Sequence, residues 1–364
     1  MPSACILIPG ATIRLSGERL IVVTPDDETG HGLKREIPLR DLERLIISEH
    51  VQITSQALGA VLTALIPVSL LDNNGDFLGS FLPPTNAHAQ SRLHQYQRTL
   101  QPDFTRLISS RIASAKLYNQ RRVLHRLNAS RRSDAKFNAD DTAAELPSDS
   151  EPLAPTITSS SHPELDRTLS WLDAAFSSIR ASHSIDEIRG YEGATTARYF
   201  SAWARFLPEN FPFERRSTRP PKNAVNSCIS FAATILYNEM VAFLHSHGLD
   251  PSLGCLHTPE NGRWSLALDL IEPFRPALVE ALALDLFSHK ILNSDCFEHR
   301  DNGVFLNDIG RRKFFLQYER RMERHFMSEL VGHRTTLRQQ LEQQSMTYKM
   351  ALETPDKFEP FVMN

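Results

Sequence analysis

Hydrophobic and polar positions alternate along the first 82 residues, which predicts a β-rich region. Two strands are expected at residues 12–15 and 20–24, on either side of a turn at Ser16-Gly17-Glu18. The same pattern predicts further strands at residues 45–47, 51–54, 68–71 and 77–82.

One short helix is expected within this β-rich region. Apolar residues recur at helical spacing between residues 56 and 65, and Ser55 is placed to cap the helix start. Pro83-Pro84 ends the region, so we expect a first domain over residues 1–84.

Beyond about residue 88 the spacing of apolar residues is helical almost to residue 350, which predicts a helical domain over residues 85–364. Residues 133–163 depart from this pattern, because Ser, Asp, Ala, Pro and Thr dominate there. Such a segment buries too little apolar surface to offset the entropy lost on ordering. We therefore predict a disordered acidic, Ser- and Pro-containing insertion between two helices.

The bulk composition sets limits on class and compartment. With 364 residues, 41% hydrophobic and 23% charged, the chain is typical of a soluble globular protein of two domains. Its four cysteines form no C-x-x-C pair, which argues against a zinc ribbon or a disulfide framework. The N-terminus lacks the features of a signal peptide, and no run of about 18 apolar residues predicts a membrane span. We expect a cytoplasmic protein without membrane contact.

Charge is unevenly distributed, although the net charge is only −3. Between residues 89 and 132, Asp103 is the single acid, whereas the basic residues are Arg92, Arg98, Arg106, Arg111, Lys116, Arg121, Arg122, Arg126, Arg131 and Arg132. A solvated helix surface is one explanation. So strong an excess of one sign on a long helix favours a surface that binds phosphates.

Two segments carry a candidate carboxylate and a candidate imidazole. Glu192 lies in Gly190-Tyr191-Glu192-Gly193, where the glycines permit close approach of a backbone or a ligand. Taken alone, Glu192 fits a carboxylate in the first turn of a helix, favoured by the macrodipole. His257 follows a helix expected to end at Gly248 and lies in a short apolar stretch, a pattern more typical of a hydrogen-bonded buried histidine.

A third segment carries two acids. Asp269 and Glu272 are three residues apart and share a face of a helix, which matches a capping box with Asp269 as the N-cap. Pro273 and Pro276 then imply an irregular or kinked first turn, which a capping box does not explain.

Two carboxylates and one imidazole form a suitable site for Mg²⁺ or Mn²⁺ with open positions for water and phosphate oxygens. A metal held in this way polarises a scissile phosphate and activates an attacking hydroxyl.

Several motifs follow one another in a fixed order. They are Gly190-Tyr191-Glu192-Gly193 with Ala197 and Tyr199-Phe200, Gly248-Leu249-Asp250-Pro251 with Gly254-Cys255-Leu256-His257, Leu268-Asp269-Leu270-Ile271-Glu272-Pro273-Phe274-Arg275-Pro276, and Leu306-Asn307-Asp308-Ile309-Gly310-Arg311-Arg312-Lys313-Phe314-Phe315 with Tyr318-Glu319. Lys116-Leu117-Tyr118-Asn119-Gln120-Arg121 also fits. In order and spacing these motifs resemble the CRISPR-associated spacer-acquisition integrases and endonucleases, over nearly the whole chain except residues 133–163.

The resemblance implies an α+β fold in which a small N-terminal β-sandwich-like domain, used for dimerisation, precedes a large all-α catalytic domain. It places the metal ligands at Glu192, His257 and Glu272, with Asp269 as a supporting catalytic acid. Members of this family act as homodimers with a small ferredoxin-like partner protein. They join the 3′-hydroxyls of a short double-stranded DNA, the spacer precursor, to repeat DNA by transesterification.

Six residues are candidates for DNA contact: Arg121, Arg122, Asn226, Arg275, Arg311 and Arg312. An arginine beside an acidic site serves equally well as a structural ion pair. The chain departs from the family pattern at Asn223-Ala224, where the family usually has Asp-Pro, so we expect a retained loop with altered turn chemistry. Two other functions stay open, a non-catalytic DNA scaffold of the same fold and a metal-dependent nuclease that acts on RNA.

Overall fold

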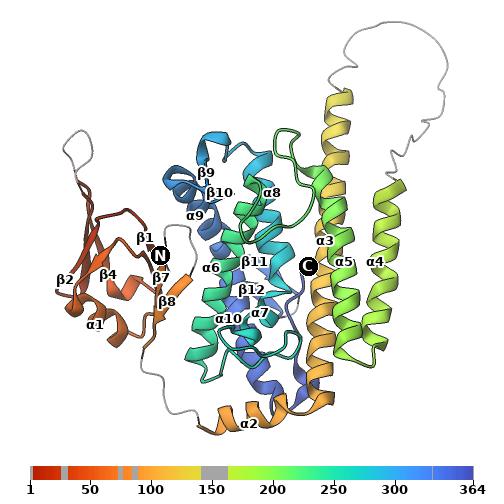
Figure 1. Cartoon of the computed structure of the whole chain (residues 1–364), viewed down its shortest axis with the longest axis horizontal. Coiled ribbons are helices and arrows are strands. Elements are labelled where there is room, and N and C mark those ends of the chain that lie inside the picture. The colour runs from red at the N-terminus through yellow and green to blue at the C-terminus, as the bar shows by residue number, and fades with distance from the viewer. Residues whose placement is uncertain are drawn as a thin grey trace, which may run out of the picture.

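The computed structural model describes residues 3–25, 32–72, 77–83, 89–140, 163–329 and 331–363. The described fold is mixed α and β and mostly helical, with the two four-stranded sheets at the N-terminal end (Figure 1). The expected domain boundary at residues 84 and 85 lies outside the described residues.

The N-terminal region contains two four-stranded sheets. One has the order β1-β5-β7-β8 and the other the order β4-β3-β2-β6. The strands are β1 (Ser3–Ile6), β2 (Thr12–Ser16), β3 (Arg19–Val23), β4 (Lys34–Pro38), β5 (Arg44–Ser48), β6 (Gln52–Ile53), β7 (Val68–Leu71) and β8 (Phe77–Phe81). Strand β5 is buried at every position because it pairs in parallel with both β1 and β7 in the middle of its sheet.

Both sheets and helix α1 (Ser55–Thr63) contribute to one hydrophobic core. The predicted strands at 12–15, 20–24, 45–47, 68–71 and 77–82 are confirmed within a residue or two, whereas β1 and β4 were not predicted. The predicted cap of α1 was wrong by one residue, because Thr54 is the N-cap and its hydroxyl accepts a hydrogen bond from the Ala57 N–H at 3.2 Å.

The rest of the described chain is helical apart from two short hairpins. The helices are α2 (Ala89–Thr99), α3 (Pro102–Asp140), α4 (Pro163–Ala181), α5 (Ile185–Trp203), α6 (Ala224–Ser246), α7 (Ser265–Ile271), α8 (Ala281–Ser288), α9 (Asp308–Glu323) and α10 (Leu337–Ala351). The hairpins pair β9 (Phe297–Arg300) with β10 (Gly303–Leu306) and β11 (Phe326–Ser328) with β12 (His333–Thr335). The expectation of an all-α second domain was therefore not met in detail, since strands of three or four residues are too short to show a clear alternation in the sequence.

Helices α3, α4 and α5 pack side by side on the side of the molecule away from the sheets (Figure 1). Helix α3 continues to Asp140, so the first residues of the predicted insertion at 133–163 are helical. The remainder of that prediction, residues 141–162, lies outside the described residues.

Helix α6 lies in the middle of the helical region. Asn223 caps it by accepting a hydrogen bond from the Asn226 N–H at 2.8 Å, so asparagine at this position preserves the helix start. In the described part of the chain, α6 alone is long and apolar enough to cross a membrane, but 72% of its most apolar window is buried inside the protein. We therefore assign it to the core.

A buried cluster of charges joins the sheets to the helices. Arg44 of β5 pairs with Glu239 of α6, and Arg338 of α10 approaches Glu239 at 3.5 Å and Glu319 of α9 at 2.9 Å. Burial raises the pKa of Glu239, but Arg44 and Arg338 outweigh that effect and hold the pKa below its usual range. The Arg44 guanidinium also lies 5.4 Å from the centre of the Phe243 ring.

Arg44→Met should lower the free energy of unfolding by about 3 kcal/mol, because it removes one partner from a buried charge cluster. Urea denaturation of the full chain measures this change. Arg19→Met is the matched control in the same domain, since Arg19 forms an exposed ion pair with Glu36 and should contribute less than about 1 kcal/mol. Equal effects of the two substitutions would contradict the assignment of Arg44 to a buried interdomain pair.

Candidate metal centre

Two of the predicted ligands meet at one lysine. The Lys116 ammonium, on α3, pairs with a carboxylate oxygen of Glu192 on α5 and lies 2.5 Å from Oε2 of Glu272 at the end of α7. Burial lowers the pKa of Lys116, but the charges of Glu192 and Glu272 outweigh it and raise the pKa overall. Two acids that are 80 residues apart in sequence are thus held around a single positive charge.

Glu192 lies in the middle of its helix. Helix α5 begins at Ile185 with Ser184 as N-cap, so the interpretation of Glu192 as a first-turn carboxylate was wrong. Its Oε1 accepts a hydrogen bond from the Thr196 hydroxyl at 3.0 Å, and Gln120 of α3 donates to that hydroxyl at 3.2 Å. These contacts fix the carboxylate on the side of α5 that faces α3.

Glu272 lies at the break predicted from the two prolines. Helix α7 ends at Ile271, and a π-helical segment, η3, follows over Arg275–Glu280. Oε1 of Glu272 accepts a hydrogen bond from Arg275 at 2.8 Å. Although burial raises the pKa of Glu272, Arg275 and Lys116 outweigh it and hold the carboxyl ionised.

Asp269 is not an N-cap, and the capping-box interpretation was wrong because α7 begins four residues earlier. Its buried carboxylate accepts hydrogen bonds from the backbone N–H groups of Cys255, Leu256 and His257 at 2.5, 2.9 and 2.8 Å. It also lies 2.7 Å from Nδ1 of His257. Because a carboxylate only accepts, Nδ1 donates this bond, and in the neutral ring Nε2 then carries the lone pair that a metal ligand needs.

The imidazole of His257 is also under electrostatic control. Burial lowers its pKa, but the hydrogen bond to Asp269 and the charges of Asp269 and Glu272 outweigh this effect and raise the pKa. The contact that fixes the ring is the one between Nδ1 and Asp269.

The loop that carries His257 is held from both sides. Arg189 of α5 donates to the Leu256 carbonyl at 2.6 Å and to the Thr258 hydroxyl at 2.7 Å. Gly254 leaves no room for a side chain, since a Cβ there would lie 2.5 Å from the His257 carbonyl oxygen. The loop therefore packs against α5 and α7 at a spacing that only glycine permits.

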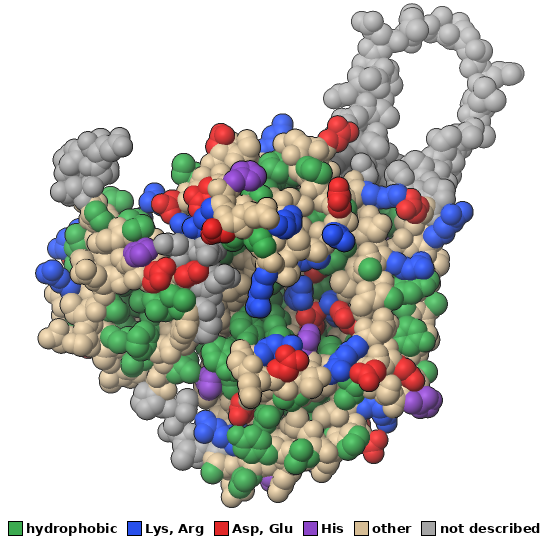
Figure 2. Space-filling model, viewed as in Figure 1, with side chains coloured by type: hydrophobic (Ala, Val, Ile, Leu, Met, Phe, Trp, Pro, Cys, Tyr) green, Lys and Arg blue, Asp and Glu red, His purple; other side chains and the backbone are tan. Residues whose placement is uncertain are grey.

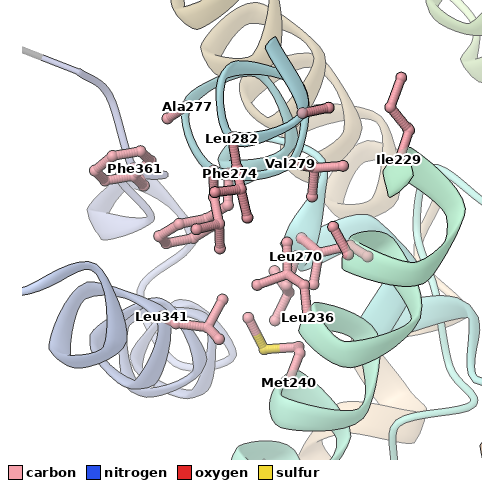
Figure 3. Close-up of a cluster of buried hydrophobic side chains, with 14 of the residues drawn as sticks. Ile229, Leu236, Met240, Leu270, Phe274, Ala277, Val279, Leu282, Leu341 and Phe361 are labelled. Atoms are coloured by element: carbon pink, nitrogen blue, oxygen red, sulfur yellow. The ribbon is translucent and has the colours of Figure 1, made fainter. Parts of the chain in front are cut away.

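An apolar base supports the break after Glu272. The rings of Phe274 and Phe361 stack with centroids 4.4 Å apart (Figure 3). Asn119 of α3 donates to the carbonyls of Pro273 and Phe361 at 2.7 and 3.0 Å and accepts from the Met363 N–H at 2.7 Å. The C-terminal segment thus ties α3 to the residue that follows Glu272.

The site is buried on one side and open on the other. The side chains of Asp269, Glu272 and Lys116 are 0%, 4% and 5% exposed, whereas those of Glu192 and His257 are 23% and 34% exposed. Figure 2 shows a hollow in this face of the molecule, with basic, acidic and histidine side chains around it.

The carboxylates of Glu192 and Glu272 and the imidazole of His257 are ligand types that bind a hard divalent cation. Oε2 of Glu272 is buried, and its close neighbour is the Lys116 ammonium at 2.5 Å. As they stand, no three His, Cys, Asp or Glu side chains within the described residues have positions that would hold a metal. The Lys116 ammonium instead lies between the two carboxylates.

The candidate DNA contacts fall into two groups. Asn226 is fully buried, and its side chain bonds to Arg216, to the Ser217 N–H and to the Arg215 carbonyl, so we assign it to the structure of this loop. Arg275 forms an ion pair with Glu272.

The remaining four candidates are on the surface. Arg121 pairs with Asp173 at 2.6 Å and Arg311 with Asp308 at 2.5 Å, each leaving part of its side chain exposed. Arg122 is half-buried and Arg312 is exposed. Arg312 is thus the most exposed of the four, whereas Arg311 is mostly buried, with 15% of its side chain exposed.

The basic residues between positions 89 and 132 have different structural roles. Arg98 donates to the Leu352 carbonyl, and Arg111 donates to carbonyls of residues 355–358, so both hold the C-terminal segment. Lys116 was predicted as a phosphate contact and belongs to the site instead. The sequence signal for this role was the three-residue spacing between Lys116 and Asn119. That spacing puts both side chains on one face of α3, the face toward the break after α7.

Comparison with known proteins identifies a family. The model described as CRISPR associated protein Cas1 matches residues 5–320. A CRISPR-associated endonuclease Cas1 from Thermodesulfovibrio yellowstonii is 30% identical, over 78% of this chain and 81% of its own length. A Cas4 exonuclease/Cas1 endonuclease fusion from Geobacter sulfurreducens is 29% identical over 93% of this chain, and the chain spans only 56% of that fusion.

Solved structures show the same fold. A casposase bound to integration product has a TM-score of 0.79 at 20% identity, covering 98% of this chain and 91% of that one. A Cas6-RT-Cas1–Cas2 complex has a TM-score of 0.75 at 24% identity, covering 100% of this chain and 36% of that one.

Asp269→Asn should lower the free energy of unfolding by about 3 kcal/mol, since an amide NH₂ would face buried backbone donors that lose their acceptor. His257→Ala removes one of the four bonds to Asp269 and should cost about 1 kcal/mol. Thermal or urea unfolding of both variants checks the difference. A larger loss for His257→Ala would show that the backbone bonds are not the main role of Asp269.

Proposed function

This chain belongs to the Cas1 family of CRISPR-associated proteins, and we propose that it is a metal-dependent DNA endonuclease and integrase. It would insert short DNA fragments into a CRISPR repeat array by transesterification. The observation that carries this proposal is the convergence of Glu192 and Glu272 on one cation, while Asp269, three residues before Glu272, orients the imidazole of His257. The names of the curated relatives and of the casposase support the endonuclease and integrase activities.

The proposed ligands of Mg²⁺ or Mn²⁺ are Glu192, Glu272 and His257. When bound, the ion would supply positive charge to the scissile phosphate and lower the barrier to attack by a hydroxyl. Asp269 keeps the proton on Nδ1 of His257, so that Nε2 of the neutral ring would be the atom that binds the ion. Arg275 balances the charge of Glu272 and keeps that carboxylate ionised.

The proposed reaction exchanges one phosphodiester for another. The 3′-hydroxyl of the incoming DNA attacks a phosphorus of the repeat, forming a new P–O bond as the old P–O3′ bond breaks. The proton of the attacking hydroxyl leaves, and the released 3′-oxygen takes one up. No energy source is needed, because the bonds made and broken are of one kind.

Surface arginines are the proposed contacts to double-stranded DNA. Arg121, Arg122, Arg311 and Arg312 each keep at least part of the side chain exposed, Arg312 the most and Arg311 only 15%, and guanidinium groups pair well with phosphates. We further propose a homodimer and a small ferredoxin-like partner protein. The likeness to a chain of a Cas6-RT-Cas1–Cas2 complex supports an assembly of this kind.

A non-catalytic DNA scaffold is the second candidate. One observation favours it, the position of the Lys116 ammonium between the two acids. Cleavage of a branched DNA with and without Mn²⁺ distinguishes the two, because a scaffold binds the DNA but does not cut it in either case.

Glu192→Gln and Glu272→Gln should each lower strand transfer at least about a hundredfold, because each removes a charged metal ligand while keeping side-chain volume. His257→Ala should have a similar effect. The measurement is joining of a labelled DNA end to a repeat duplex, with circular dichroism to verify folding. Glu298→Gln, in the β9–β10 hairpin, is the control and should retain activity. Retained joining in the Glu272 variant would remove that residue from the ligand set.

Arg122→Met combined with Arg312→Met should weaken binding to duplex DNA of any sequence. The slope of log affinity against log salt should fall by about 0.9 for each phosphate that the protein no longer neutralises. Fluorescence anisotropy at several salt concentrations measures both effects. Arg40→Met, on the N-terminal domain, is the control because Arg40 is largely exposed and pairs with Asp41. An unchanged slope in the double variant would exclude these arginines from the DNA interface.

A further inference from the structure

The position of Lys116 raises a question about how a metal enters the site. Its side chain is buried on α3, and its ammonium pairs with the carboxylates of both Glu192 and Glu272. These carboxylates belong to different helices and approach each other only around this nitrogen. The space that a shared divalent ion requires is therefore the space that the ammonium occupies.

Buried charge in the site is balanced by the lysine. Lys116 and Arg275 are two cations, and Glu192 and Glu272 are two anions in contact with them. Without Lys116, Glu192 would lose this ion pair and Glu272 would keep the one with Arg275, in a site where removing charge from water is costly. Lys116 therefore offsets carboxylate charge when no metal is bound.

A divalent ion and the ammonium cannot both bind the two acids. Oxygen ligands lie about 2.1 Å from Mg²⁺, so an ion between the carboxylates would contact the nitrogen, and the two positive charges would repel each other. The stem of Lys116 is flexible, with four carbons that allow the ammonium to leave one carboxylate while the helix stays in place.

We propose that Lys116 is a built-in counter-ion that competes with the divalent metal for Glu192 and Glu272. It stabilises the metal-free site and weakens metal binding, and the ion must displace it from at least one carboxylate. This inference rests on the proposed metal site, and it concerns a residue outside the ligand set.

The test is the affinity for Mn²⁺ of the chelator-treated full chain, measured by titration calorimetry. Lys116→Met should bind Mn²⁺ at least about tenfold more tightly than the unaltered protein, a change of the size typical beside metal sites. Its melting temperature without metal should be lower, and Mn²⁺ should raise that temperature more than in the unaltered protein. Lys222→Met is the matched control, since Lys222 is exposed and bonds to the Asn302 carbonyl.

Equal or weaker Mn²⁺ binding by Lys116→Met than by the control would overturn the competition while leaving the metal site intact. Absence of Mn²⁺ binding in every variant would overturn the proposed metal site and this inference together. If Lys116→Met fails to fold, structures of the unaltered protein with and without Mn²⁺ decide. The Lys116 nitrogen should lie beyond about 4 Å, the limit of an ion pair, from at least one carboxylate when Mn²⁺ is bound. Contact with both acids in that state would contradict the proposal.

Discussion

The pairing of one buried ammonium with two carboxylates determines how the helices of the catalytic region meet. An ionised acid is costly to bury unless a cation accompanies it, so Glu192 and Glu272 constrain where Lys116 must lie. That requirement fixes α3, α5 and the end of α7 at one point. The break after α7 follows from Pro273 and Pro276, and it turns Glu272 toward this point without a continuing helix.

Asp269 also holds the loop that carries His257 in place at the site. Its carboxylate gathers three successive backbone N–H groups, and the last of them belongs to His257. The direction of the imidazole is therefore set by the path of its own backbone as well as by its bond to Asp269. Gly254 is needed for this path, because any side chain there would collide with the carbonyl of His257. One buried acid thus folds a loop and orients a ring together.

The sequence predicted the local elements better than the contacts between them. Alternation of apolar residues locates the strands near residues 12–24 and 68–82, since each strand buries one face. Pro273 and Pro276 likewise predicted irregular helix geometry near Glu272, because proline disrupts a helix through its own ring and its neighbours in sequence. Lys116 and Asn226 were misplaced because their partners are far along the chain. A lysine in a basic segment resembles a phosphate contact until the fold brings two acids to it, and only the fold shows that Asn226 is enclosed.

Under the proposed function, the exposure of the proposed ligands determines the side from which DNA would reach them. Lys116, Asp269 and Glu272 are enclosed, so a phosphate would approach from the side where Glu192 and His257 reach the surface. Gly190 and Gly193 lie on the same helix as Glu192, and a Cβ added at either would meet no atom of another part of the described structure within 4 Å. Packing therefore does not require glycine at these two positions. Gly254 differs, because its close contacts determine the internal shape of the site.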